Sequence, residues 1–329
     1  MNRGTNGYTG WDRKAVIGLD GVVITGGRGQ LGRELDVVLN DAGISHLCLD
    51  LPEYDITDTG SIVAMMIEYR PALVIHTAAY TNVDLGETDR TKAASVNAHA
   101  TAGLAGFCAA KGIPLAYIST DFVFDGLKTM PYETDDRPNP LNVYGATKLQ
   151  GEEKVRASGG PFWIVRTSWL FGVYGENFPK AILRLAAKGQ TPRVVSDQVG
   201  SPTHAGDLAF ALCQLTGILP RMDPVLFGIY HYANAGSCSW YEFAIAILEY
   251  SGWLKVDPGL RPVPITGDKL QRPARRPAYS VLSVEKATTA GLRIRDWREG
   301  LRSFLTILAT REPALFPSVD CDSGPLTRD

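Results

Sequence analysis

A short apolar segment, GVVIT (residues 21–25), leads directly into the glycine-rich stretch GGRGQLG, and a helical pattern follows. An apolar, β-branched run without polar alternation is typical of a strand that is buried on both faces of a sheet. In the next segment, apolar residues from Leu31 to Leu39 recur at helical spacing, and Gly43 is suited to a C-terminal cap. The succession predicts a parallel βαβ unit, and no other feature constrains the fold as strongly.

The same alternation continues through the first half of the chain. Further strands are predicted at 46–50, 72–79, 115–124 and 161–172, with helices at 61–70, at about 88–111 and around Tyr144. Such alternation predicts an α/β fold, a Rossmann-type doubly wound parallel sheet with helices on both faces. After Phe171 the pattern loosens into helices and short extended pieces interrupted by proline, which indicates a smaller, interleaved C-terminal lobe.

Composition excludes several classes of partner. The chain has 33 basic and 35 acidic residues, a net charge of −2, so no basic field exists for a nucleic acid or an anionic membrane. No apolar stretch approaches the length of a membrane span. The five cysteines are odd in number and form no CxxC pair, so we expect neither a disulfide framework nor a zinc site. We interpret them as small buried residues of a cytoplasmic protein.

The glycine-rich stretch places Gly26, Gly29 and Gly32 between a strand and a helix. In this context glycines allow close approach of a pyrophosphate, and the helix N-terminus supplies N–H donors, so we predict dinucleotide binding. Asp50 ends the second strand, where an acid holds the adenosine ribose. Asp50 favours NADH, whereas Arg28 could accept a 2′-phosphate, so NADPH stays open. The alternatives are a plain turn at the loop and a turn former at Asp50.

Tyr144 and Lys148 lie four residues apart and therefore share a helical face. A free phenol has a pKa of about 10, too high for fast proton transfer at neutral pH. We expect the lysine cation, with the positive nicotinamide of the oxidised cofactor, to lower the pKa of Tyr144, and Lys148 to bond the nicotinamide ribose. The alternative is a helix surface where the two residues are neighbours by chance.

The segment Ser119–Thr120–Asp121 ends the strand predicted at 115–124. Ligands of doubly wound sheets bind outside the carboxyl ends of the strands, so a hydroxyl at this place can face the same cofactor as Tyr144. Alternatively, these hydroxyl groups satisfy only local backbone groups.

Eight motifs occur in order between about Gly21 and Arg311: ITGGRGQLG, AAYTNVD, STDFVFDG, PLNVYGATKLQGE, RTSWLFG, NF, DQVGSPT and ARRP. Together they resemble the dTDP-4-dehydrorhamnose reductase family of the extended short-chain dehydrogenase/reductase superfamily. The resemblance implies NADPH- or NADH-dependent reduction of the C4 ketone of a dTDP-4-keto-6-deoxyhexose, foremost dTDP-4-dehydro-L-rhamnose. The alternatives are a 4-ketoreductase for another dTDP-deoxysugar of secondary metabolism and a non-catalytic, dinucleotide-binding regulatory subunit.

The resemblance also implies roles by position. Thr120, Tyr144 and Lys148 match the catalytic trio, and Asp121 and Trp169 match positions that touch the sugar nucleotide, although Trp169 could instead be a core residue. Besides Tyr144 and Lys148, the expected cofactor-binding residues are Gly26, Gly29, Gln30, Leu31, Gly32, Asp50, Asp55, Ile56, Ala79, Tyr80 and Thr81.

Two further points concern anions and metals. Arg275 and Arg276, flanked by prolines, suit a rigid loop that grips a diphosphate, the alternative being solvated loop charges. Some family members bridge a dimer through Mg²⁺ held by glutamates, and Glu34 matches one such position. The segment AKGQTPR before VVSDQ holds no acid, so we predict no metal, and a monomer or a homodimer stays open.

The domain organisation follows from these assignments. We predict a flexible extension at 1–20 and a flexible tail at 313–329. The dinucleotide-binding domain takes 21–172 and about 204–235, and the sugar-nucleotide-binding lobe takes 173–203 and 236–312.

Overall fold

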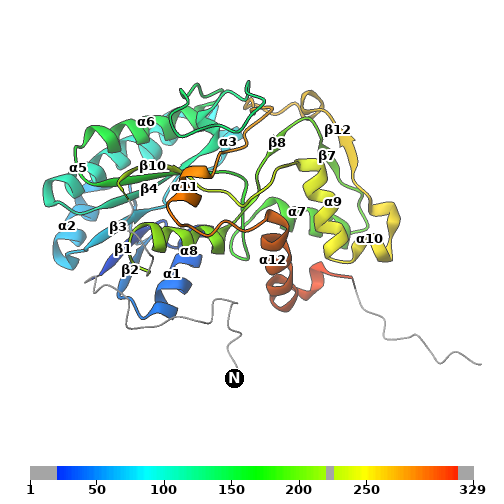
Figure 1. The fold of residues 1–329 in the computed structure, drawn as a ribbon, viewed down its shortest axis with the longest axis horizontal. Coiled ribbons are helices and arrows are strands. Elements are labelled where there is room, and N and C mark those ends of the chain that lie inside the picture. Colours follow the sequence, from blue (N-terminus) through cyan, green and yellow to red (C-terminus); the bar gives the residue numbers. More distant parts are fainter. Residues whose placement is uncertain (1–20, 220–225, 318–329) are drawn as a thin grey trace, which may run out of the picture.

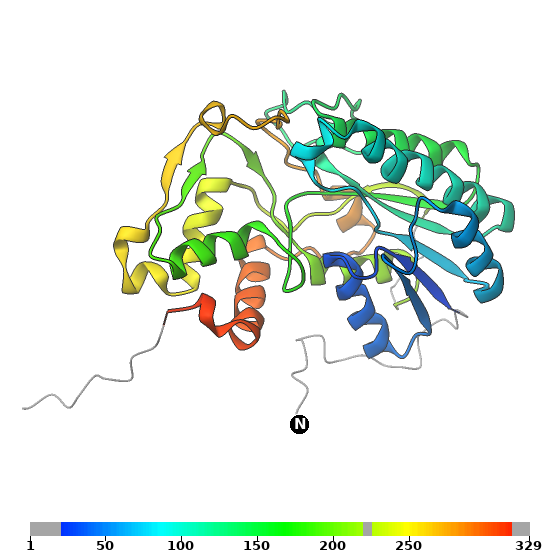
Figure 2. The same cartoon turned by 180° about the vertical axis from the view of Figure 1, so that it is seen from behind.

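The computed structural model describes residues 21–219 and 226–317 of the 329-residue chain. The extension predicted at 1–20 lies outside the described residues, as does the predicted tail from 318 onward. Within the described ranges, a larger lobe built on a central sheet stands beside a smaller, mainly helical lobe (Figure 1 and Figure 2).

The central sheet has six strands in the order β10–β5–β4–β3–β1–β2, and every neighbouring pair is parallel. β2 lies on one side of β1, and the chain then crosses back to place β3 on the other side. The strand order therefore reverses at β1, and its carboxyl end is the switch point at which such sheets bind ligands. The predicted Rossmann-type fold is confirmed. The strands are β1 (Val22–Thr25), β2 (His46–Leu49), β3 (Leu73–His76), β4 (Leu115–Thr120), β5 (Phe162–Thr167) and β10 (Gly228–His231).

Helices cover both faces of this sheet (Figure 1 and Figure 2). Val22 and Ile24 of β1 face one core and Val23 faces the other, because successive side chains of a strand point to opposite faces. The first core is closed by α1 (Gln30–Ala42) and α8 (Ala205–Leu215). The second core is closed by α2 (Thr59–Tyr69), α5 (Thr101–Lys111) and α6 (Val143–Ala157).

The smaller lobe has a separate apolar core that includes Leu183, Phe243 and Phe304. These residues come from α7 (Phe178–Ala187), α9 (Trp240–Tyr250) and α12 (Trp297–Arg311). Three two-stranded pairs lie outside the central sheet: β6 (Leu170–Phe171) with β9 (Thr203–His204), β7 (Arg193–Val195) with β12 (Val263–Ile265), and β8 (Val199–Gly200) with β11 (Cys238–Ser239). A short helix, α10 (Trp253–Val256), completes the smaller lobe, whereas α11 (Glu285–Thr289) packs on β10 and places Ala287 in the first core of the larger lobe.

The domain boundaries remain a proposal, which this packing supports with two exceptions. The predicted smaller lobe, 236–312, includes α11, which packs on the larger lobe. The other exception is at the C-terminus. The flexible tail was expected to begin at 313, but Pro313–Leu315 forms a short 3₁₀ turn. Leu315 is buried in the core of the smaller lobe, and its carbonyl oxygen accepts a hydrogen bond from the indole N–H of Trp253 at 2.9 Å. Burial of a large apolar side chain stabilises this segment against the lobe, so the docked chain extends past residue 313.

Three predicted elements are interrupted. The strand predicted at 161–172 ends at Thr167, and Trp169 then takes a left-handed backbone conformation with φ 46°. The helix predicted at about 88–111 is divided by a π-helical turn, Ser95–Ala100, between α4 (Arg90–Ala94) and α5. The strand predicted at 115–124 ends at Thr120, where a 3₁₀ turn begins. Strained backbone and π-turns often occur at functional sites, and Trp169 and Ser95 both line the main cavity.

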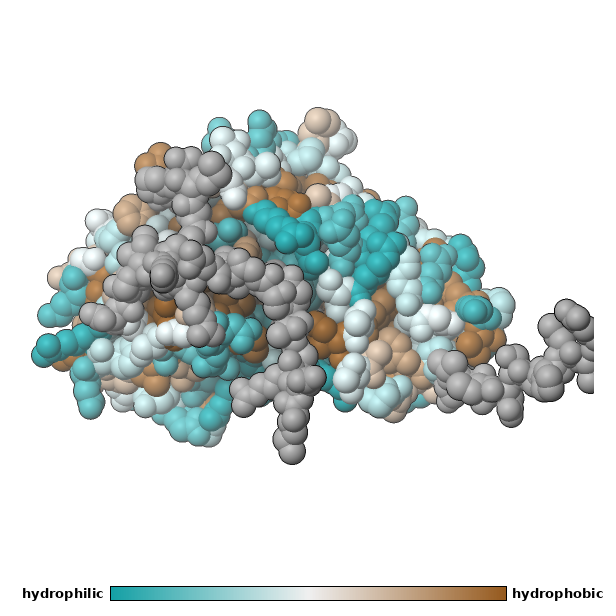
Figure 3. Space-filling view, turned by 60° about the horizontal axis from the view of Figure 1, so that its bottom comes forward, coloured by the Kyte–Doolittle hydropathy of each residue, from teal (hydrophilic) through white to brown (hydrophobic). Residues whose placement is uncertain are grey.

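In the view of Figure 3, the coloured surface shows hydrophobic patches interspersed with hydrophilic side chains. In the described part of the chain, none of the helices has the length and apolar character needed to cross a bilayer. Cys108, Cys213 and Cys238 are buried free thiols and Cys48 is a half-buried one, whereas Cys321 lies outside the described residues.

Candidate active site and cofactor cavity

The carboxyl ends of β1, β3, β4 and β5 open into a cavity of ≈ 1200 Å³. Drug-sized ligands occupy sites of about 300–1,000 Å³, so this cavity has room for a dinucleotide and part of a second molecule. Most residues predicted for the site line it: Gly26, Gly29, Gln30, Leu31, Asp50, Asp55, Ile56, Ala79, Tyr80, Thr81, Thr120, Asp121, Tyr144, Lys148 and Trp169.

The glycine-rich loop lies at the switch point. Gly26 has φ 73°, and a Cβ atom there would lie 2.6 Å from the backbone nitrogen of Ala78, so only glycine fits. Gly29 precedes the first turn of α1, whose unpaired N–H groups are ready donors for a pyrophosphate. Gly32, in contrast, does not line the cavity. A Cβ atom at Gly32 would collide with the carbonyl of Gly26, so Gly32 permits the helix to pack on the loop.

Two polar side chains bear on cofactor choice: Arg28 in the glycine-rich loop and Asp50, which follows β2. The carboxylate of Asp50 accepts hydrogen bonds from the backbone N–H of Arg28 at 2.7 Å and of Leu51 at 2.8 Å. The guanidinium of Arg28 pairs with Glu53 at 2.8 Å and also donates to the carbonyl of Leu51. The cavity therefore has an acceptor for ribose hydroxyl groups and, beside it, a cation that could meet a 2′-phosphate.

Asn97 does not line the cavity but positions a loop that does, a role that sequence reasoning missed. This buried side chain lies in the π-helical turn, and its Oδ1 and Nδ2 bond the N–H and the carbonyl of Tyr80 at 2.8 and 3.2 Å. Its Nδ2 also donates to the hydroxyl of Thr147 at 3.0 Å. Asn97 thus ties the loop that holds Ala79 and Tyr80 to the helix that carries Tyr144. No local pattern around residue 97 signals a π-turn.

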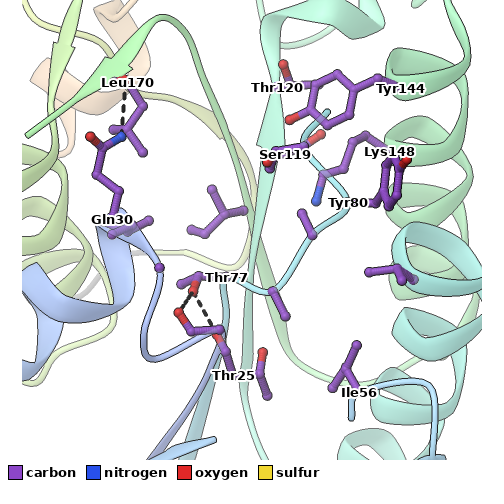
Figure 4. A pocket seen from close by; sticks show the side chains of 18 of the residues that line it. Thr25, Gln30, Ile56, Thr77, Tyr80, Ser119, Thr120, Tyr144, Lys148 and Leu170 are labelled. Carbon is purple, nitrogen blue, oxygen red and sulfur yellow. Dashed lines mark hydrogen bonds between the residues drawn. The ribbon is translucent and has the colours of Figure 1, made fainter. Parts of the chain in front are cut away.

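The predicted catalytic trio lies on one wall of the cavity, as Figure 4 shows. Thr120 is the last residue of β4, and Tyr144 and Lys148 occupy successive turns of α6. The start of α6 is held by Asn142, whose side chain accepts a hydrogen bond from the N–H of Gly145 at 2.8 Å. The carboxyl end of one strand and the first turns of the next helix therefore bring the three residues together.

Burial controls the protonation states of Tyr144 and Lys148. We call the part of the cavity lining that carries Thr120, Tyr144 and Lys148 the catalytic wall. Burial raises the pKa of Tyr144 to about 12, an effect that the charge of Asp121 reinforces and the hydrogen bond with Thr120 opposes. It lowers the pKa of Lys148 to about 7, although the carboxylate of Glu152 acts in the opposite direction. The expected lowering of the Tyr144 pKa by Lys148 is therefore not found, because desolvation of the phenolate is the largest effect. The phenol is protonated throughout the physiological pH range, as a proton donor must be.

A buried ion pair between Arg166 and Glu152 lies close to Lys148 and affects its charge. The guanidinium of Arg166 bonds the carboxylate of Glu152 through Nη2 at 2.8 Å and Nε at 3.0 Å. Ser119 donates its hydroxyl to the same carboxylate at 2.5 Å. Glu152 follows Lys148 by one helical turn, so its negative charge favours the protonated lysine.

Asp121 is fully buried beside Thr120, whose hydroxyl donates to its Oδ1 at 3.0 Å. Burial raises the pKa of Asp121 to about 7, against the lowering effect of the hydroxyl groups of Ser280 and Thr120. The other oxygen, Oδ2, has no hydrogen-bond partner among the described residues. A buried carboxyl oxygen of this kind can accept a hydroxyl group of a ligand.

A second cavity of ≈ 630 Å³ adjoins the first and shares Phe122, Trp169 and Trp240 with it. The rings of Trp169 and Trp240 stack with their centroids 3.5 Å apart and 8° between their planes. Trp240 begins α9, whose start is secured by a capping box between Ser239 and Glu242. Sequence reasoning missed Trp240, because no motif around it indicates that it meets Trp169.

The two adjacent arginines have different surroundings in the second cavity. Arg276 forms a two-point ion pair with Asp84 of α3 (Val83–Gly86), with N–O distances of 3.0 and 2.8 Å. It therefore braces its loop and is not free to grip a diphosphate as expected. Arg275 is exposed, and no ion pair of its side chain is found in the described part of the chain. Arg193 and Arg272 line the same cavity.

Glu34, which matches a Mg²⁺ position of the family, is buried at the seam between α1 and α8. A Cβ atom added at Gly206 would lie 3.4 Å from its carboxylate and 2.9 Å from the ring of His204. Burial raises the pKa of Glu34, and His204 opposes the shift. Within residues 21–219 and 226–317, no cluster of three metal-binding side chains forms around Glu34.

Comparison with known proteins agrees with this geometry. A protein-family model described as the RmlD substrate binding domain matches residues 20–310. The chain is 42% identical over 286 residues to dTDP-4-dehydrorhamnose reductase of Mycolicibacterium smegmatis, covering 85% of this chain and 84% of the relative. It is 40% identical over 294 residues to the probable dTDP-4,6-dihydroxy-2-methyloxan-3-one 4-ketoreductase of Streptomyces antibioticus, covering 88% of this chain and 97% of the relative.

A solved structure extends the comparison to three dimensions. The crystal structure of dTDP-4-dehydrorhamnose reductase from Bacillus anthracis, in complex with NADP, is similar with a TM-score of 0.80 and 37% identity. The match covers 88% of this chain and 99% of that chain. The chain therefore belongs to the RmlD family, the dTDP-4-dehydrorhamnose reductases of the extended short-chain dehydrogenase/reductase superfamily.

Proposed function

We propose that this chain reduces the C4 ketone of a dTDP-4-keto-6-deoxyhexose with NADPH or NADH. Its proposed substrate is dTDP-4-dehydro-L-rhamnose, which becomes dTDP-L-rhamnose. The observation that carries the proposal is the convergence of Thr120, Tyr144 and Lys148 in the cavity that also contains the glycine-rich loop and Asp50. The relatives named dTDP-4-dehydrorhamnose reductase support the substrate class.

The loop, the first turn of α1 and Asp50 are the groups that would hold the cofactor. The lack of space for a side chain at Gly26 and the free N–H groups after Gly29 fit a dinucleotide diphosphate. Asp50 supports NADH, whereas Arg28 beside it and the NADP complex of the Bacillus anthracis relative support NADPH. When bound, the reduced cofactor supplies the hydride that C4 of the sugar receives.

The side chains of the catalytic wall donate a proton and a hydrogen bond to the ketone oxygen. Tyr144, kept protonated by its raised pKa, donates the phenolic proton to that oxygen as negative charge develops. Thr120, whose hydroxyl rests on Asp121 at 3.0 Å, turns to donate a hydrogen bond to the same oxygen, where it matters most in the transition state. Lys148 orients the nicotinamide ribose, and Glu152 sustains its positive charge.

The nucleoside diphosphate is proposed to occupy the second cavity, beyond the stacked rings of Trp169 and Trp240. Guanidinium groups match phosphate oxygens, so Arg193, Arg272 and Arg275 would provide the positive charge for this part of the substrate. The free oxygen of Asp121 would accept a hydroxyl of the sugar.

A second candidate function is reduction of another dTDP-4-keto deoxysugar of secondary metabolism. The 40% identity to the probable 4-ketoreductase of Streptomyces antibioticus supports this second function. The two candidates share the catalytic wall and differ in the sugar that the region near Trp169 accepts.

A panel of substrates tests both candidates. The purified full-length chain is given several dTDP-4-keto sugars, each with NADPH and with NADH, while the nicotinamide absorbance is followed. We expect the highest kcat/KM with dTDP-4-dehydro-L-rhamnose and a product identified by NMR as the L-rhamno sugar. A clear preference for another keto sugar would select the second candidate. Failure to oxidise either cofactor with any of the sugars would overturn both.

We further propose that the protein acts in the cytoplasm, as a monomer or a homodimer, with neither nucleic acid nor membrane as a partner. The free thiols of Cys48, Cys108, Cys213 and Cys238 support a reducing compartment. The net charge of −2 argues against binding to polyanions.

A further inference from the structure

We propose that Asp36, His46 and Cys48 form a binding site for a thiophilic divalent cation such as Zn²⁺, separate from the cofactor cavity. One potential ligand atom from each residue lies within 4.8 Å of the other two. His46 and Cys48 are two residues apart on β2, so both side chains point to the same face of the sheet. Asp36 reaches them from α1, which covers that face.

His46 is held in an orientation that presents its Nε2 to Asp36. Its Nδ1 lies 2.9 Å from the backbone carbonyl of Ile44, which can only accept, so Nδ1 carries a proton. Its Nε2 lies 2.9 Å from Oδ1 of Asp36, a carboxylate oxygen that can also only accept. Nε2 of His46 and Oδ1 of Asp36 are therefore two potential ligand atoms that face each other.

The surroundings match the second shell of a metal site. Metal-binding histidines usually donate their other ring N–H to a carbonyl or carboxylate, which orients the ring as Ile44 orients His46. The imidazole is 8% exposed, whereas the carboxylate side chain of Asp36 is 47% exposed. The cluster of Asp36, His46 and Cys48 is thus open to solvent on the side of Asp36. A water molecule there would complete a tetrahedral set with the N, O and S ligands.

Cys48 provides the selectivity. Its Sγ lies 3.9 Å from Oδ1 of Asp36, so a thiol and a carboxylate oxygen are neighbours here. A thiol loses its proton when it becomes a metal ligand. Thiolate and imidazole together favour Zn²⁺ over Mg²⁺ or Ca²⁺, which prefer oxygen ligands.

The site lies behind the glycine-rich loop without entering the cavity. None of the three residues lines the cavity of ≈ 1200 Å³, although β2 leads directly to Asp50 at its edge. A Cβ atom at Gly27 would lie 2.5 Å from the Cβ atom of Cys48, so the loop rests on this cysteine. A cation here would cross-link the edge strand β2 to α1 beneath the loop.

Cobalt spectroscopy tests the proposal. The full-length protein is treated with a chelator, desalted and titrated with CoCl₂, and then ZnCl₂ is added in competition. We expect one tightly bound Co²⁺ per chain with a thiolate-to-metal charge-transfer band, which Zn²⁺ removes. Cys48→Ser should abolish the band, and Asp36→Asn should weaken binding at least about tenfold, the range seen when metal-site contacts are lost.

Controls separate the site from other thiols and from misfolding. Cys321→Ser alters a thiol far along the chain and should leave both the band and the stoichiometry unchanged. Circular dichroism confirms that each variant is folded. A Co²⁺ band that persists in Cys48→Ser, or no saturable binding by the folded wild type, would overturn the proposal and leave an imidazolium–carboxylate pair beside an uninvolved thiol.

Discussion

The two cavities are built in different ways. The catalytic wall of the larger cavity consists of a strand end and a helix, and Thr120, Lys148 and Glu152 are almost completely buried there. Of the arginines of the smaller cavity, Arg272 and Arg275 lie on irregular chain, Arg193 begins the three-residue strand β7, and Arg275 is exposed. Reaction chemistry thus depends on groups held in regular structure, whereas recognition of the substrate depends on loops between short elements.

The electrostatics differ in the same way. In the catalytic wall desolvation is the first cause of the pKa shifts of Tyr144, Lys148 and Asp121. In the smaller cavity the positive charges are near water, and one of them, Arg276, is already neutralised by Asp84. Substitutions in the first region should therefore affect turnover and folding strongly, and substitutions in the second should change substrate affinity by smaller factors.

The largest effect is expected for Tyr144→Phe. Loss of the general acid should lower kcat by about two to four decades, the usual contribution of positioned proton transfer, with little change in cofactor affinity. Steady-state kinetics and cofactor titration measure the two quantities. Tyr241→Phe, on α9, is the matched control and should keep wild-type kcat, because Tyr241 lines neither cavity. Near-normal turnover in Tyr144→Phe would refute the role assigned to the phenol.

Loss of the buried ion pair between Glu152 and Arg166 should lower the free energy of unfolding more than loss of an exposed pair. Glu152→Gln leaves Arg166 buried without its full counter-charge, so we expect the free energy of unfolding to fall by about 3–5 kcal/mol. Arg184→Gln breaks the exposed pair with Glu176 and should change stability by less than about 1 kcal/mol. Urea denaturation measures both. Equal losses in the two variants would show that burial does not set the difference.

The pH dependence of kcat/KM should follow the protonation of Lys148. Because its pKa is about 7, the protonated lysine of the free enzyme is lost as pH rises through this value, while Tyr144 stays protonated up to about 12. We expect kcat/KM to fall by about tenfold per pH unit well above the midpoint. Lys148→Met should remove the decline along with much of the activity. A profile of the wild type that is flat between about pH 6 and 9 would contradict this assignment.

The smallest effects are expected in the smaller cavity. Arg275→Ala should raise KM for the sugar nucleotide by about tenfold, the equivalent of one charged hydrogen bond, and leave kcat unchanged. Arg276→Ala should resemble Asp84→Asn, and the double variant should add little, because both changes break one ion pair. Additive effects on KM from Arg276 and Asp84 would show that Arg276 contacts substrate directly.

Most of the catalytic site was accessible from sequence because its parts are local. A glycine loop between strand and helix, an acid at the end of the next strand, and Tyr144 with Lys148 on one helical face each depend on neighbours within a few turns. Thr120 could be placed because strand ends of a parallel sheet meet at one edge. The alternation of strands and helices likewise determined the sheet, since parallel βαβ units have a preferred handedness.

Only the tertiary structure decided the features that depend on distant contacts. Trp240 meets Trp169 across 71 positions of sequence, Asn97 braces Tyr80 from a π-turn, and Asp84 engages Arg276 from the other lobe. The protonation of Tyr144 and Lys148 was decided in the same way, because desolvation depends on everything packed around a group. Local pattern thus determined which chemistry is possible, and packing determined its surroundings and the charge of the groups that perform it.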